Sequence, residues 1–190
     1  MPNMATASAE DFSDLHERVL GFMGAFSTTQ FAIDNVIGLY LQRRMPDLGS
    51  ALQKQFLGKI RDDQRLSLFK AFAAEAGYKG DLTQFEPIYL RAKQLRDLIG
   101  HSLNVIGPVY SQDKRPFVSV TRDSSTKIER VPSPIFPSTF VRMTADCEWI
   151  IEHVWRAGYT AEPDMFVSVD GKPAEPPVPA ALPEGGEPLA

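Results

Sequence analysis

The sequence contains a single cysteine, Cys147, among its 190 residues. It can therefore form neither an intrachain disulfide nor a zinc site built from several cysteines. One thiol is typical of a protein in the reducing cytoplasm. Cys147 lies within the apolar-periodic run FVRMTADCEWII, which predicts a small buried hydrophobic side chain rather than a nucleophile.

Long apolar runs are also missing. No uninterrupted apolar stretch approaches the length of about 18 residues that a membrane-spanning helix needs. The first residues, MPNMATASAEDFSD, have neither the basic n-region nor the apolar h-region of a secretory signal. We therefore expect a soluble, cytoplasmic protein that does not contact a membrane.

The common catalytic and cofactor motifs are absent as well. The sequence has no GxGxxG, GxxxxGK[ST], HExxH or GxSxG pattern, and its three histidines do not have the spacing of metal ligands. We therefore expect no cofactor and no metal site. Twenty basic and 24 acidic residues give a net charge of -4, which excludes a protein that coats nucleic acid. Any contact with nucleic acid must come from a local basic patch.

What the sequence does contain is helical periodicity. Apolar residues recur at steps of three and four from Phe12 to Tyr40, which predicts one long helix over about 11–43. The segment MPDLGS (45–50) is interpreted as a helix breaker. Three further helical regions are predicted over about 50–77 with a bend near 58–62, over 83–100 from a capping-box pattern, and over 140–158 with Gly158 as its end.

Two other kinds of segment accompany the helices. Residues 115–132 alternate apolar and polar side chains on both sides of RDSS, which predicts a β-hairpin. Residues 161–190 are rich in Pro, Glu and Ala and are predicted to form a mostly disordered tail, and residues 1–10 a flexible N-terminus. The predicted fold is all-α, a four- to five-helix bundle over 11–160 with a small β-hairpin insert before the last helix.

The histidines differ in their surroundings. His16 lies near the start of the first predicted helix on a face expected to be solvated. His153 stands beside Val154 and Trp155, and we expect a packed, structural side chain. His101 is preceded by an arginine and a carboxylate in the segment RDLIGH, residues 96–101. Arg96, Asp97 and His101 are therefore the candidate catalytic residues.

In this motif and its all-helical setting the sequence resembles the ribonucleases of the HEPN superfamily (higher eukaryotes and prokaryotes nucleotide-binding). Those proteins carry an arginine, a polar residue and, a few positions on, a histidine. The resemblance implies a homodimeric helical bundle that cleaves RNA without a metal at a composite site between two copies. It also implies a role in toxin–antitoxin or phage-defence systems, with an antitoxin or nucleotidyltransferase as partner. The polar residue is most often Asn in that family, whereas this sequence has Asp97.

The side chains suit that chemistry. RNA supplies its own nucleophile, the 2′-OH, so an enzyme needs a proton-transfer group such as His101 and a cation such as Arg96 for the phosphate. Asp97 is four residues from His101 and shares a helix face with it, so it can orient the imidazole ring. Arg96 and His101 lie about 140° apart around a helix, so they meet only if the helix yields at Gly100 or if two chains contribute.

Another interpretation stays open. Arg96, Asp97 and His101 are also ordinary polar residues for the end of a helix, where cations meet the negative end of the dipole. The chain is then a non-catalytic helical interaction or scaffold protein, or an RNA-binding remnant of the family.

Overall fold

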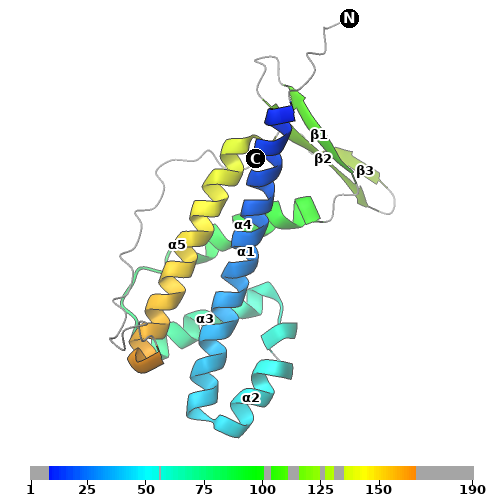
Figure 1. The fold of residues 1–190 in the computed structure, drawn as a ribbon. Coiled ribbons are helices and arrows are strands. Elements are labelled where there is room, and N and C mark those ends of the chain that lie inside the picture. Colours follow the sequence, from blue (N-terminus) through cyan, green and yellow to red (C-terminus); the bar gives the residue numbers. More distant parts are fainter. Residues whose placement is uncertain are drawn as a thin grey trace, which may run out of the picture. The chain divides into compact units, whose positions relative to one another are not determined.

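The four predicted helical regions are present in the computed structural model, which describes residues 9–55, 57–100, 104–110, 116–124, 127–130 and 135–165. Five α-helices lie within these residues (Figure 1): α1 (Ala9–Arg44), α2 (Pro46–Gln55), α3 (Asp62–Glu75), α4 (Phe85–Gly100) and α5 (Pro137–Ala161). Short 3-10 turns follow α2 and α5, η1 (Leu57–Lys59) and η2 (Pro163–Met165). The helical bundle is therefore confirmed. No helix among the described residues is both long enough and apolar enough to cross a membrane.

Three short strands lie between α4 and α5. They are β1 (Asn104–Tyr110), β2 (Pro116–Ser124) and β3 (Lys127–Arg130), paired antiparallel in the order β1-β2-β3. β2 and β3 fall in the range where the sequence predicts a hairpin. β1 was not predicted, because its sequence NVIGPVY contains a glycine and a proline and does not alternate.

The chain divides into two compact units, each of which is described by itself. Unit 1 comprises Met1–Phe26, Leu90–Asp146 and Pro183–Ala190, and unit 2 comprises Ser27–Tyr89 and Cys147–Leu182. The boundaries fall within α1, α4 and α5. The prediction of one helical domain over 11–160 stays a prediction. The predicted N-terminus (1–10) and tail (161–190) lie outside the described residues, except for 9–10 and 161–165.

Unit 1 has a core of apolar side chains from its parts of α1, α4 and α5. The Phe22 ring lies 6.2 Å from the Phe140 ring and 6.5 Å from the Phe26 ring, measured between centroids. All three are at most 1% exposed. Ala92 and Leu95 from α4 and Met143 from α5 complete this core. Since α4 buries one stripe here, the residues on its flanks reach the surface.

Unit 2 is built around stacked aromatic rings and aliphatic side chains. The Phe69 and Phe85 rings stack with centroids 4.7 Å apart, and both are fully buried. A buried polar network lies beside them: Asp62 Oδ1 accepts hydrogen bonds from Arg65 and from the Tyr89 hydroxyl at 2.8 and 2.7 Å. Cys147 is fully buried, which confirms its predicted role as a small hydrophobic residue.

Two of the differences from the predicted helix boundaries have a clear physical reason. The predicted breaker over 45–50 is confirmed at Met45, which separates α1 from α2, but it is wrong for 46–50, because α2 begins at Pro46, where the first turn of a helix tolerates a missing N–H. Gly49 lies inside α2 and packs so closely on the backbone of Leu41 that a Cβ would overlap it. Gly158 does not end α5, which continues to Ala161 and stops before Pro163, two residues further on.

Candidate functional site

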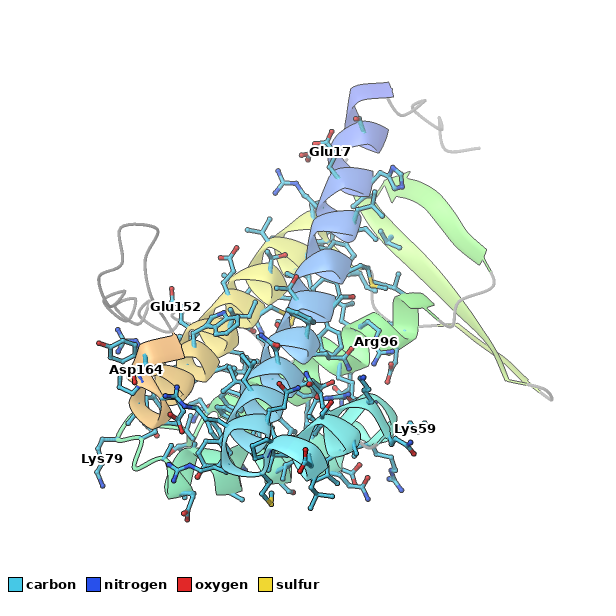
Figure 2. The ribbon with its side chains drawn as sticks, turned by 60° about the horizontal axis from the view of Figure 1, so that its bottom comes forward. Glu17, Lys59, Lys79, Arg96, Glu152 and Asp164 are labelled. Carbon is cyan, nitrogen blue, oxygen red and sulfur yellow. The ribbon has the colours of Figure 1, made fainter. Side chains whose placement is uncertain are left out.

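Two of the three predicted site residues lie side by side on α4, in unit 1. Arg96 and Asp97 occupy the flank of the helix next to the buried Leu95, and their side chains are 28% and 24% exposed. Figure 2 labels Arg96 on this helix. His101 lies outside the described residues, one position beyond the last residue of α4. The described structure thus brings Arg96 and Asp97 together, and the contact of either with His101 stays a prediction.

Arg96 lies against an aromatic ring of the core. Its guanidinium carbon is 5.1 Å from the centroid of Phe26, a residue of α1 that is 1% exposed. Such stacking is a cation–π interaction, and it restricts the orientation of the long arginine side chain. It uses the face of the guanidinium, whereas phosphate oxygens bind its edge, so both interactions are compatible. The sequence does not reveal Phe26, because no spacing rule links it to Arg96.

Asp97 is held between two cations of its own helix. Its Oδ1 is 3.2 Å from Nη1 of Arg96, and its Oδ2 accepts a hydrogen bond from Nζ of Lys93. Both carboxylate oxygens therefore contact cations of α4, whereas the sequence prediction paired Asp97 with His101. Lys93 was missed, although its spacing of four residues to Asp97 is typical of a helical ion pair. Lys93, Arg96 and Asp97 together carry one net positive charge, which makes a small basic patch on an acidic protein.

A second ion pair in unit 1 has a buried carboxylate. Nη2 of Arg91 on α4 lies 3.6 Å from Oδ2 of Asp146 on α5, and the Asp146 side chain is 3% exposed. Burial raises the pKa of Asp146, and the charges of Arg91 and Arg142 lower it in part. Oδ2 of Asp146 has no hydrogen-bond partner among the described residues. No spacing rule in the sequence links Arg91 to Asp146, so this pair was not predicted.

The other two histidines have the surroundings predicted for them. His16 is exposed, and His153 is 4% exposed and packs on Trp149 with ring centroids 4.1 Å apart. No three His, Cys, Asp or Glu side chains in the described part of the chain are grouped in a way that would hold a metal ion.

Comparisons with known proteins identify no relative of this chain. The chain matches no family model, no curated protein and no solved structure. The residues around Arg96 are therefore the basis on which a function can be inferred.

Proposed function

We propose that this chain is a HEPN-like endoribonuclease that cleaves RNA by attack of the 2′-OH, without a metal ion. The observation that carries the proposal is the position of Arg96 in the segment RDLIGH. Its guanidinium is stacked on the buried Phe26 ring while 28% of the side chain stays exposed. A charged group that is oriented in advance stabilises a developing charge better than one that must reorganise.

The proposed reaction is a transesterification within the RNA. The 2′-oxygen attacks the neighbouring phosphorus, the bond to the 5′-oxygen breaks, and a 2′,3′-cyclic phosphate and a 5′-hydroxyl end form. His101 accepts the 2′-OH proton or donates one to the leaving oxygen, and Arg96 binds the non-bridging phosphate oxygens. In this proposal Asp97 also orients His101, because a carboxylate has about four acceptor sites and can bind the imidazole in addition to Lys93 and Arg96. Its ion pair with Arg96 gives it a further positioning role.

The proposal includes partners. Two copies in a homodimer would place Arg96 of one chain opposite His101 of the other, which removes the angular mismatch on a single helix. An antitoxin or nucleotidyltransferase that restrains the enzyme belongs to the same proposal. The homodimer with a composite site is overturned if the purified protein is strictly monomeric and fully active on RNA.

A second function has one observation in its favour. Leu20 and Phe31 on α1 are 57% and 64% exposed, which is unusual for large apolar side chains. A non-catalytic interaction protein, or an RNA-binding remnant of the family, would use such side chains to bind a partner helix. In that case Arg96 and His101 are incidental.

Cleavage of a labelled single-stranded RNA by the purified protein separates the two functions. We expect Arg96→Ala and His101→Ala each to abolish cleavage, and Arg96→Lys to lose most of it because lysine cannot bind phosphate bidentately. Arg61→Ala is the matched control, because Arg61 is a solvent-exposed arginine of unit 2 with a side chain that is 79% exposed. Cleavage should persist in EDTA. The enzyme proposal fails if wild type never cuts RNA, or if both alanine variants cut as wild type does.

A further inference from the structure

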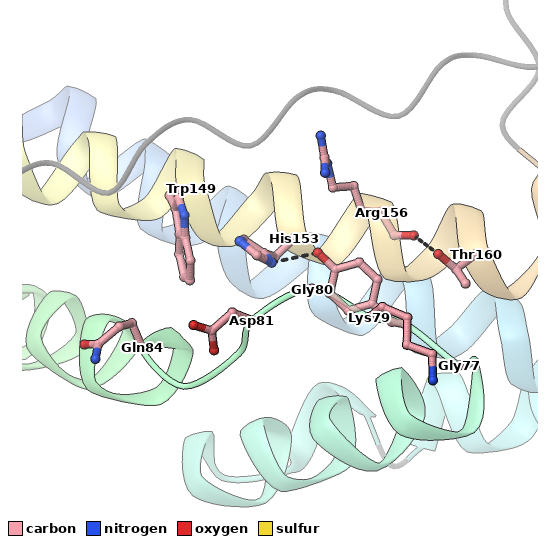
Figure 3. A pocket seen from close by; sticks show the side chains of 10 residues that line it. Gly77, Lys79, Gly80, Asp81, Gln84, Trp149, His153, Arg156 and Thr160 are labelled. Atoms are coloured by element: carbon pink, nitrogen blue, oxygen red, sulfur yellow. Dashed lines mark hydrogen bonds between the residues drawn. The ribbon is translucent and has the colours of Figure 1, made fainter.

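Unit 2 contains a pocket of about 620 Å³ that has no part in the proposed RNA chemistry. One wall is the segment 77–84 between α3 and α4, and the other is a stripe of α5 (Figure 3). The α5 residues are Trp149, His153, Arg156 and Thr160, at positions i, i+4, i+7 and i+11 of one helix face. This spacing places all four residues on the side of α5 that borders the pocket.

Two glycines shape the opposite wall. Gly77 follows the end of α3 with a φ of 72°, a conformation that favours glycine, and the N–H of Tyr78 donates a hydrogen bond to the carbonyl of Ala73 at 2.9 Å. This turn sends Tyr78 towards α5. Gly80 lies so close to the phenol of Tyr78 that a Cβ there would overlap the ring. The absence of a side chain at Gly80 therefore allows Tyr78 to reach its position.

Three rings form the inner surface of the pocket. The Tyr78 hydroxyl is 2.7 Å from Nδ1 of His153, and the His153 ring packs on Trp149 with centroids 4.1 Å apart. Burial lowers the pKa of His153 and raises that of Tyr78. A neutral imidazole beside a protonated phenol accepts a hydrogen bond from the phenol O–H at Nδ1 and carries its own hydrogen at Nε2. The wall is thus aromatic and uncharged at neutral pH.

The charges of the pocket come from its outer residues. Lys79 and Arg156 are cations, and the charge of Arg156 lowers the pKa of both Tyr78 and His153, so it acts directly on the aromatic wall. Asp81 is the only carboxylate in the lining, and its Oδ1 accepts a hydrogen bond from the N–H of Thr83 at 2.8 Å. The lining therefore carries one net positive charge beside three rings.

We propose that this pocket binds a small aromatic anion, a flat unsaturated ring that carries one phosphate or carboxylate group. The ring packs on Tyr78 and the edges of His153 and Trp149, and the anionic group binds Arg156 or Lys79, whose side chains extend away from one another (Figure 3). A cationic ligand is disfavoured by two cations against one hydrogen-bonded carboxylate. An anion without a ring would leave the aromatic surface unused. The volume suits a ligand of the size of a nucleotide or smaller.

Tryptophan fluorescence tests the proposal, because Trp149 forms part of the wall. The Trp155→Phe variant leaves Trp149 as the single tryptophan of the chain. Adenosine 5′-monophosphate and benzoate are titrated separately, since they offer a phosphate and a carboxylate on an aromatic ring. Adenosine and inorganic phosphate, titrated alone, each offer half of the ligand. We expect a saturable change with one or both aromatic anions and at least about tenfold weaker binding of the two halves.

Substitutions then locate the site. Lys79→Ala with Arg156→Ala should weaken binding at least about tenfold through loss of charge-assisted hydrogen bonds. The matched control is Lys54→Ala with Arg61→Ala, which removes the same charges from exposed positions of unit 2 outside the pocket. Gly80→Ala, which displaces the Tyr78 ring, should weaken binding while both cations remain. The proposal is overturned if neither aromatic anion changes the fluorescence up to about 10 mM. The proposal is also overturned if adenosine binds as tightly as adenosine 5′-monophosphate, or if the Lys79/Arg156 variant binds the aromatic anions as wild type does. RNA cleavage does not enter these measurements, so their failure is distinct from failure of the proposed ribonuclease.

Discussion

Arg96 lies over the ring of Phe26, with its guanidinium carbon 5.1 Å from the ring centroid. The contact joins α4 to α1 within unit 1 and links a side chain of the core to one of the proposed site. Phe26 is 1% exposed, so the ring cannot follow the arginine into solvent. The core of unit 1 therefore restricts where Arg96 can place its charge.

Phe26→Leu should separate orientation of Arg96 from stability. Leucine keeps the position apolar but removes the flat surface, so we expect a loss of about 1–2 kcal/mol in unfolding free energy and a larger proportional loss of RNA cleavage. Urea unfolding and cleavage rates measure the two effects. Phe22→Leu is the control, because Phe22 is equally buried and contacts Phe26 and Phe140. If both variants lose activity only in step with stability, Phe26 does not orient Arg96.

Asp97→Asn tests the carboxylate between Lys93 and Arg96. The change introduces the residue most frequent at this position in the resembled family and removes one negative charge. We expect tighter RNA binding with a steeper salt dependence, because two cations are released from an internal ion pair. Stability should change by less than about 1 kcal/mol, as is usual for partly exposed ion pairs. Filter binding at several salt concentrations measures the effect. Equal affinity of wild type and variant at every salt concentration would contradict a phosphate contact at this patch.

The sequence predicted the helices well because their apolar residues recur with the helical period. It also placed Arg96 and Asp97 near the end of the helix that is α4 in the structure. Contacts between segments far apart in the sequence could not be predicted. The contact of Arg96 with Phe26 and that of Arg91 with Asp146 result from packing, and no sequence spacing indicates them. The sequence prediction failed from Pro46 to Gly49, because proline and glycine usually favour turns. Here proline lies in the first turn of α2, and Gly49 allows a close contact with the backbone of Leu41.

Asp146→Asn should alter the dependence of stability on pH. Burial raises the pKa of Asp146 in the folded chain, so the folded state binds this proton more readily than the unfolded state. The resulting stability is present below the unfolded pKa and is lost as pH rises through the folded pKa. The asparagine variant lacks this loss, so its stability relative to wild type should increase from about pH 4 towards neutral pH. Unfolding at several pH values measures it. A constant difference between the two proteins would show that Asp146 titrates normally.

Tyr78→Phe should lower the stability of unit 2, because it removes one hydrogen bond. The hydroxyl lies 2.7 Å from Nδ1 of the buried His153, so its removal leaves a buried acceptor without this donor. We expect a loss of about 1–3 kcal/mol in unfolding free energy. Tyr40→Phe is the matched control, because the Tyr40 ring packs edge-on to Phe72 and its ring contact does not depend on the hydroxyl. Equal effects of the two substitutions would mean that the bond to His153 contributes nothing to stability.

His153 should make the fold sensitive to acid. Burial lowers its pKa in the folded chain, with a smaller effect of Arg156 in the same direction, while Glu152 and Asp81 raise it in part. The unfolded chain therefore binds this proton at a higher pH than the folded chain does. The stability that His153 contributes is present above about pH 6.5 and declines as pH falls below it towards the folded pKa. Unfolding of wild type and His153→Gln between about pH 5 and pH 8 measures the difference, since glutamine keeps a polar side chain without a titrating group. We expect wild type to lose stability relative to the variant as the pH falls, and His16→Gln, at an exposed position, to leave the profile of wild type unchanged.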